Sequence, residues 1–304
     1  MSDLTMSTDP EIAKFQNAII NKEEGIFYGI PDPLYFAAPA FSQSKLKKYL
    51  VSPRGAMLKP DDISLEAQVF GHALEVAVWQ PEQFDDIYYP SQYETYCKGM
   101  DKESLSFGGR IGISKSHYPI LKNIDEALRL SECYHDVKIR EGKYQVVLLW
   151  WQDEVYCKAK LDKVSDEGDQ FQIYDLKSFT SKKDISVKSL GWHCKDYGYD
   201  IQAAFYLDAY IYLKKLSLGS GDFVNVFCEK AENPEIIGCT IGESNLDAGR
   251  EKIKKGLAIY RETLKNEHHA LEMTCEYMML REQNADVPDP AKFVTLSWFE
   301  VSYE

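Results

Sequence analysis

The stretch that decides the fold is VYCKAKLDKVSDEGDQFQIYDLKS, residues 155–178. It contains two runs in which apolar and polar residues alternate, 155–165 and 171–178, joined by a short polar connection. Such alternation is typical of β-strands that bury one face. A third strand-like run, 144–151 (YQVVLLWW), precedes them across another short polar link. Because the links are short, the simplest arrangement is an antiparallel meander of three strands.

Charged residues occur within this meander where a polar face is expected. Asp175 and Lys177 are two residues apart on one strand, so their side chains share a face. Asp162 lies near the end of the preceding strand, and a meander can bring it beside Asp175. Two carboxylates at that distance repel each other, and a hard divalent cation such as Mg²⁺ relieves the repulsion. Lys177 could then hold or help deprotonate a metal-bound water. A lone DxK sequence is more often a structural ion pair.

The rest of the chain predicts helices and further strands around the meander. Apolar residues recur at helical spacing over 64–79, 115–131, 199–216 and 243–266, and Ser42 or Ser44 can cap a short helix that ends before Pro53. Two more strands are expected over 222–229 and 235–241. We therefore predict a mixed α/β (α+β) fold. Residues 82–113 lack clear periodicity, and the SFGGRIG segment within them indicates a loop. Prolines 31, 33 and 39 predict a loosely structured lead-in over residues 1–40.

Two of the predicted helices carry polar residues that indicate a functional site only when they are considered together. His72 lies in the GHALE segment of the first, with Glu75 three residues on and close to it on the helix surface. Gln202 and Tyr206, four residues apart in QAAFY, share one face of the helix over 199–216. Taken alone, a histidine on an apolar helix is more often a packed core residue than a ligand. A Gln and Tyr pair is likewise more often packing than function.

The charge and cysteine content of the chain exclude several classes of protein. Lys and Arg total 35 against 48 Asp and Glu, a net charge of −13, which argues against a general nucleic-acid coat protein. No stretch approaches the roughly 18 consecutive apolar residues of a membrane-spanning helix, and no secretory signal is expected. The seven cysteines are scattered and never spaced CxxC, so we expect a reducing cytoplasm. Basic residues gather in two groups that could contact phosphates: Lys45, Lys47, Lys48, Arg54 and Lys59, and Lys182, Lys183, Lys188 and Lys195.

The order GH…D…DxK…QxxxY resembles the PD-(D/E)xK nuclease superfamily, in the branch that includes RecB-type nuclease domains. Within that branch the chain is most similar to RecE-like, exonuclease VIII-like enzymes. The narrower likeness rests on SQSKLKKYLVSP (42–53), VFGHALEVAVWQPEQF (69–84), KLDKV with YDLKS, and YDIQAAFYLDAY (199–210). The resemblance implies a restriction-endonuclease-like core, a central mixed sheet flanked by helices. It would form a single nuclease domain over 41–304, with a helical region from about 243.

The resemblance also implies roles for individual residues. His72, Asp162 and Asp175, with the backbone carbonyl of Leu176, would bind Mg²⁺, for which Mn²⁺ would substitute. Lys177 would position the attacking water, and Glu75 is a possible outer partner. Gln202 and Tyr206 would orient DNA or brace the catalytic strands. Contacts to DNA phosphates are expected from the remaining candidates: Lys45, Lys48, Arg54, Lys182 and Lys183.

The activity implied is that of an exonuclease that digests linear double-stranded DNA from the 5′ end and leaves 3′ single-stranded tails. Such enzymes form rings, commonly tetramers, and work with a RecT-type single-strand annealing protein, which would place this chain in a phage or prophage module of a bacterial host. Three alternatives stay open. They are a PD-(D/E)xK endonuclease, a single-strand-specific nuclease, and a noncatalytic DNA-binding scaffold that keeps the fold.

Overall fold

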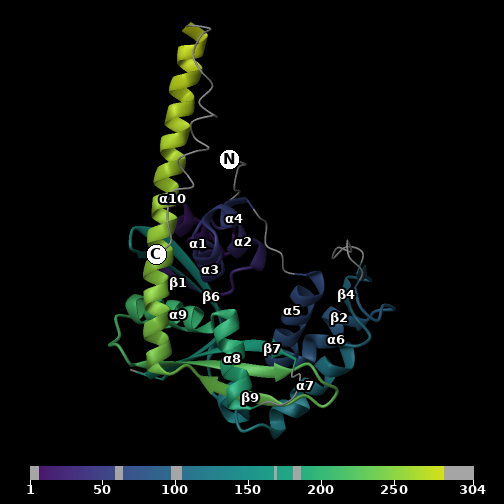
Figure 1. The fold of residues 1–304 in the computed structure, drawn as a ribbon. Helices are drawn as coiled ribbons and strands as arrows, with labels where there is room; N and C mark the ends of the chain where they lie inside the picture. Colours follow the sequence, from purple (N-terminus) through teal and green to yellow (C-terminus); the bar gives the residue numbers. More distant parts are fainter. Residues whose placement is uncertain (1–6, 59–63, 97–104, 168–169, 181–185, 284–304) are drawn as a thin grey trace.

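A mixed β-sheet of six strands forms the centre of the computed structural model, which describes residues 7–58, 64–96, 105–167, 170–180 and 186–283 (Figure 1). The strand order is β1-β5-β6-β7-β8-β9; β7 and β8 are parallel and the other neighbours antiparallel. This arrangement confirms the expected mixed sheet and its antiparallel meander, β5-β6-β7. The strands are β1 (Gly25–Phe27), β5 (Lys143–Gln152), β6 (Val155–Glu167), β7 (Gln170–Phe179), β8 (Gly221–Glu229) and β9 (Ile236–Thr240).

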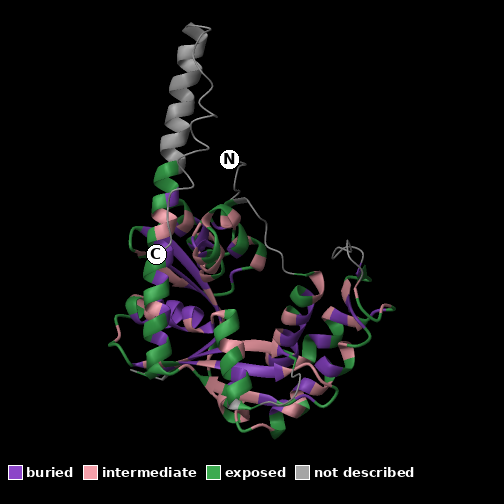
Figure 2. Cartoon of the chain, in the orientation of Figure 1, coloured by how far each residue is buried: buried purple, intermediate pink, exposed green. Residues whose placement is uncertain are grey.

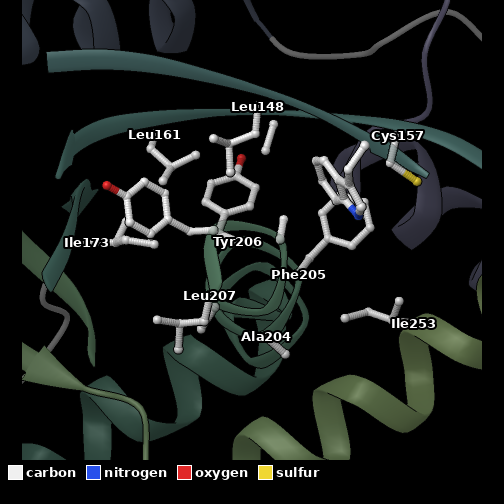
Figure 3. Close-up of a cluster of buried hydrophobic side chains, with 14 of the residues drawn as sticks. Leu148, Cys157, Leu161, Ile173, Ala204, Phe205, Tyr206, Leu207 and Ile253 are labelled. Atoms are coloured by element: carbon white, nitrogen blue, oxygen red, sulfur yellow. The ribbon is translucent and has the colours of Figure 1, made fainter. Parts of the chain in front are cut away.

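Helices cover both faces of the sheet. On one face α9 (Tyr199–Lys214) packs against β5, β6 and β7, with α3 (Gln43–Val51) and α10 (Glu243–Gln283) outside it. Figure 3 shows Phe205 and Tyr206 reaching from α9 toward the strands that carry Leu148 and Leu161. On the other face lie α5 (Leu65–Trp79) and α7 (Tyr118–Leu130). Buried positions follow the strands and α9, whereas α8 (Val187–Tyr197) and α10 present many exposed ones (Figure 2).

Helix α10 lies close against α3 and α9 because two of its residues have no side chain. A Cβ atom added to Gly249 would lie 2.4 Å from the carbonyl oxygen of Asp200 on α9. One added to Gly256 would lie 2.8 Å from Cγ of Leu46 on α3. Both distances are too short for a real contact, so only glycine permits this approach. The helix also runs to residue 283, well past the residue 266 expected from the sequence.

Along strand β5, the side chains switch from one face of the sheet to the other at a single residue. Tyr144 contacts the ring of Trp79 on α5, yet Val146 packs in the core beneath α9, although strict alternation would put both on one face. The change occurs at Gln145, whose φ of 52° lies in the left-handed region that strand residues avoid. Tyr144 pairs with Lys163 and Val146 with Leu161, so Asp162 lies opposite the irregular residue. The irregularity therefore coincides with a predicted site residue.

The lead-in over residues 1–40 is regular over most of its described part, and the expectation of loose structure was wrong there. Helix α1 (Pro10–Asn21) is capped by the side chain of Asp9, β1 pairs with β5, and α2 (Asp32–Ala37) follows. Of prolines 31, 33 and 39, Pro33 was misinterpreted as a breaker, because it lies in the first turn of α2. There the missing N–H costs nothing and the fixed φ favours the helix, as it does for Pro10 at the start of α1.

Lys158 of β6 ties α2 to the sheet. Its ammonium is buried and donates to the carbonyl oxygens of Tyr35 (2.8 Å), Phe36 (3.2 Å) and Ala38 (2.7 Å) at the end of α2. Lys158→Met should lower the free energy of unfolding by about 2–4 kcal/mol, because it removes the three hydrogen bonds that the ammonium donates to these carbonyls. Urea denaturation would measure this. The exposed Lys188, changed in the same way, should leave stability within about 0.5 kcal/mol, and an equal loss in both variants would contradict the prediction.

Residues 82–113, which lack clear periodicity in the sequence, contain a second sheet, and the SFGGRIG segment predicted as a loop is a hairpin of that sheet. Strands β2 (Tyr88–Pro90), β3 (Ser106–Phe107) and β4 (Arg110–Ile113) pair in the order β2-β4-β3. Gly108 and Gly109 form the β3–β4 turn with φ of 59° and 79°, values that favour glycine. The short elements are α4 (Pro53–Leu58), η1 (Pro81–Gln83), α6 (Phe84–Ile87) and η2 (His135–Ile139).

Most of the other predicted elements are confirmed. The helices expected over 64–79, 115–131 and 199–216 are α5, α7 and α9, and the strands expected over 222–229 and 235–241 are β8 and β9. Ser42, not Ser44, caps α3. Helix α8 was not predicted. Within the described residues, no helix is both long enough and apolar enough to cross a bilayer.

Candidate active site

Asp162 of β6 and Asp175 of β7 lie next to each other, as the meander predicted. Oδ2 of Asp162 accepts a hydrogen bond of 2.8 Å from the backbone N–H of Leu176, the residue after Asp175. Asp175 itself is only 3% exposed. The pKa of Asp162 is raised well above its ordinary value, first by burial of its carboxyl group and then by the negative charges of Asp175 and Glu75. The neighbouring negative charges therefore oppose ionisation of Asp162.

Lys177 completes this pair from the same face of β7. Its ammonium forms an ion pair with Oδ2 of Asp175, and Nζ lies 4.7 Å from the centre of the Tyr199 ring at the start of α9. Its side chain is 15% exposed, so solvent reaches it only in part. The Asp175–Lys177 ion pair is therefore present. It lies beside the carboxylate of Asp162, which an isolated structural ion pair would lack.

Gln202 and Tyr206 approach Asp175 and Lys177 from the face of the sheet that α9 covers. Nε2 of Gln202 donates a 2.6 Å hydrogen bond to Oδ1 of Asp175. Gln202 is 5% exposed and Tyr206 6%, and the Tyr206 ring packs in the core with Leu148 and Leu161. Of the two roles considered for these residues, their burial favours bracing the catalytic strands over contacting DNA.

Glu75 approaches from α5, on the other face of the sheet. Its Oε2 accepts a 3.1 Å hydrogen bond from Nε2 of Gln145, the residue at which β5 exchanges faces. The pKa of Glu75 is raised to about 7, chiefly by burial. The charges of Asp32 and Asp175 also raise it, whereas Lys160 and the hydrogen bond from Gln145 oppose the increase. Glu75 therefore belongs electrostatically to the same group as Asp162 and Asp175. The sequence suggested it only as an outer partner.

His72 lies one helical turn before Glu75 but is mostly exposed. Its Nδ1 shares a hydrogen bond with the hydroxyl of Tyr88 on β2. The alternative of a packed core histidine therefore does not describe it. Its role as a metal ligand stays a prediction.

Lys47, which was not among the residues individually expected to contact DNA, lies beside the site. Lys47 of α3 donates a 2.7 Å hydrogen bond to the carbonyl oxygen of Tyr197, and its Nζ lies 5.6 Å from the Tyr199 ring centre. Its pKa is lowered to about 8, first by burial and then by the positive charge of Lys177. The basic segment 42–60 indicated this group of lysines, but nothing in the sequence singles out Lys47.

The positions of the basic residues predicted to contact DNA do not test that prediction. Lys45 lies over the rings of Phe41 and Tyr260, at 5.8 and 5.2 Å from their centres. Lys48 is half-buried on α3, and Arg54 is exposed on α4. Lys182 and Lys183 lie outside the described residues. Contact of these five residues with DNA stays a prediction.

The oxygen-rich group fits a hard divalent cation. Among the residues that the structure describes, no three His, Cys, Asp or Glu side chains already converge as a complete metal-binding set. Nevertheless the negative charge of Asp175 raises the pKa of both Asp162 and Glu75, so ionisation of these two carboxyl groups is costly. A divalent cation removes that cost, and carboxylate and carbonyl oxygens are the donors that Mg²⁺ and Mn²⁺ prefer.

The mixed sheet, with Asp162 on one strand and Asp175-x-Lys177 on the next, defines a PD-(D/E)xK type of fold and site. The sequence profile of the family described as "PDDEXK-like domain of unknown function (DUF3799)" matches residues 42–281. The chain therefore belongs to this family. The match supports the superfamily that the motifs indicated, without distinguishing the RecE-like branch.

A solved structure has the same fold. The crystal structure of a "putative exonuclease" from Eubacterium rectale superposes with a TM-score of 0.56 at 16% sequence identity, covering 78% of this chain and 87% of that one. At this identity the likeness concerns the fold. No curated protein matches the chain.

Proposed function

We propose that the protein is a divalent-metal-dependent deoxyribonuclease. The observation that carries the proposal is the contact of Asp162 with the backbone beside Asp175, together with the ion pair between Asp175 and Lys177. An ion pair formed for stability alone has no need of a second, repelling carboxylate. The family description and the name of the structural neighbour agree with a nuclease.

Each residue of the site has a role in this reaction. Asp162, Asp175 and the carbonyl of Leu176 would hold the cation, with His72 as a further ligand. When bound, the cation polarises the phosphoryl oxygen and lowers the pKa of a bound water. Lys177 orients the attacking water and stabilises charge that develops on the phosphate.

The supporting residues fix these groups in place. Gln202 holds the carboxylate of Asp175 through one oxygen, which leaves the other oxygen to Lys177 and the cation. Lys47, close to Lys177, adds positive charge where the phosphate would lie.

We further propose the specific activity that the sequence resemblance implies. The enzyme would digest linear double-stranded DNA from the 5′ end, leaving 3′ tails for a RecT-type annealing protein in the cytoplasm of a bacterial host. A ring of subunits, a tetramer by the same resemblance, would turn basic residues inward and acidic ones outward. Such a ring reconciles DNA binding with a net charge of −13.

The experiment uses linear duplex DNA labelled at the 5′ or the 3′ end of one strand, and a covalently closed circle, each with and without Mg²⁺. Early metal-dependent release of the 5′ label from linear DNA, with the circle intact, is the expected result. Early release of the 3′ label would reverse the polarity, and cleavage of the circle would indicate an endonuclease. An absence of cleavage with either Mg²⁺ or Mn²⁺ would overturn the proposal in favour of a DNA-binding scaffold.

Gln202→Leu should weaken the site without removing any group that touches the substrate. Loss of the hydrogen bond to Asp175 should reduce activity at limiting Mg²⁺ by about 10- to 100-fold, and excess Mg²⁺ should restore part of it. Tyr210→Phe is the matched control, since it deletes a 3.0 Å hydrogen bond from the same helix to Asp166 outside the site. Titration of activity against Mg²⁺ concentration measures both, and an unchanged Mg²⁺ requirement in Gln202→Leu would contradict the role.

A further inference from the structure

Helix α8 carries a large aromatic side chain on its outer face. Its inner side packs Leu190 and Cys194 against a buried cluster that contains Phe179 and Phe227. Trp192 lies on the outer side and is 55% exposed. Tyr197, the last residue of the helix, is 58% exposed. Leaving two such rings in water forgoes the burial that aromatic side chains normally gain, which suggests a ligand.

A continuous series of rings connects this surface with the candidate active site. The ring of Tyr197 stacks on that of Tyr199, with centres 5.9 Å apart and planes inclined by 27°. The Lys177 ammonium also contacts Tyr199 and lies 4.7 Å from its ring centre. The exposed ring of Tyr197 is therefore two contacts away from the lysine of the site. Lys47 holds the carbonyl oxygen of Tyr197 and thereby fixes the end of the helix.

Positive charge accompanies the exposed ring of Trp192. Nζ of Lys195 lies 5.1 Å from the centre of the Trp192 ring. Lys188 is exposed four residues before Trp192 and so falls on the same side of the helix. One exposed acid, Asp196, lies among them. Flat aromatic surfaces beside ammonium groups match the chemistry of single-stranded nucleic acid, whose bases stack while its phosphates pair with lysines.

We propose that Tyr197 and Trp192 form a stacking site for unpaired bases of the DNA strand that is cut. This inference rests on the proposed nuclease function and adds a binding site to it. The bases must be unpaired because a base within a duplex already stacks on its neighbours and has no free face. The position next to Tyr199 and Lys177 assigns the site to nucleotides that flank the scissile phosphate.

The test measures binding of the full chain to a fluorescein-labelled oligothymidylate by fluorescence anisotropy, in EDTA so that nothing is cut. Tyr197→Ala and Trp192→Ala should each weaken binding by about 5- to 100-fold, and Tyr197→Phe, which keeps a ring, should bind almost as wild type. Tyr212→Ala is the matched control, because Tyr212 on α9 is 54% exposed and hydrogen-bonded to Glu24.

Salt dependence separates stacking from charge. Tyr197→Ala should leave the slope of log Kd against log salt unchanged, whereas Lys195→Ala should reduce it by about 0.7. Oligothymidylate binding by Tyr197→Ala and Trp192→Ala equal to that of Tyr212→Ala, with wild type still cutting DNA, would overturn the stacking site and leave the nuclease. A wild-type protein that neither binds nor cuts DNA would overturn both.

Discussion

Replacement of Lys177 by alanine is expected to reduce DNA hydrolysis by about 1,000-fold while binding to DNA persists. The ammonium is paired directly with Asp175, and removing a single preorganised charge-stabilising group costs about 100- to 1,000-fold. Loss of the water's orientation adds to this. Lys177→Arg should recover little activity, because a planar guanidinium does not reproduce a compact ammonium. Initial rates on linear duplex DNA in Mg²⁺ measure the effect.

The control for this change is a lysine in a comparable ion pair outside the site. Lys214 lies 2.7 Å from a carboxylate oxygen of Asp166, and Lys214→Ala should cut DNA at the wild-type rate. Normal hydrolysis by Lys177→Ala would remove the lysine from the mechanism. Equal losses in both variants would point to a general effect of charge on DNA binding.

Asp162→Asn is expected to abolish activity and, in the absence of metal, to stabilise the fold. Asparagine keeps an oxygen that can accept from the backbone N–H of Leu176, but it removes one of the mutually repelling charges. We expect activity to fall by about 1,000-fold or more. The free energy of unfolding should rise by about 1–3 kcal/mol at neutral pH, a shift in Tm of several degrees. Thermal unfolding in EDTA measures the second effect.

The pH dependence of this stabilisation has a definite sign. Folding raises the pKa of Asp162, so the folded chain binds this proton more tightly than the unfolded chain does. Wild-type stability should therefore decrease as pH rises from the ordinary carboxyl pKa of about 4 toward the raised one, and Asp162→Asn should lack this decrease.

The two proteins should converge at acid pH and differ most at neutral pH. Asp166→Asn, which removes a partly exposed carboxylate paired with Lys214, should show no such gain. A Tm of Asp162→Asn below that of wild type at neutral pH would contradict the repulsion.

Local pattern predicted the strands and the pairing at the site, because both depend on short connections. Asp162 and Asp175 are placed by alternation and by a tight hairpin, and both features can be read from the sequence. Gln202 is placed by the helical spacing of α9, and the motif order drew attention to it.

The parts of the site that the sequence left undetermined depend on contacts between distant segments. Glu75 was expected only as an outer partner and Lys47 only as one of a basic group, because no local pattern fixes where their helices dock on the two faces of the sheet. The irregular backbone at Gln145 breaks the period of two on which strand prediction rests. The regular lead-in was missed because its prolines favour the first turn of a helix as well as a break.

The contacts of α10 bear on when the site can form during synthesis of the chain. Every candidate ligand, and the bracing pair Gln202 and Tyr206, has been made once residue 206 is added. Gly249 and Gly256 let α10 pack against α9, which carries Gln202, and against α3, which carries Lys47. A ribosome-bound chain that ends before residue 249 would contain every residue of the site but would lack these contacts of α10. The outer support of α3 and α9 is therefore added only after the chemistry of the site has been synthesised.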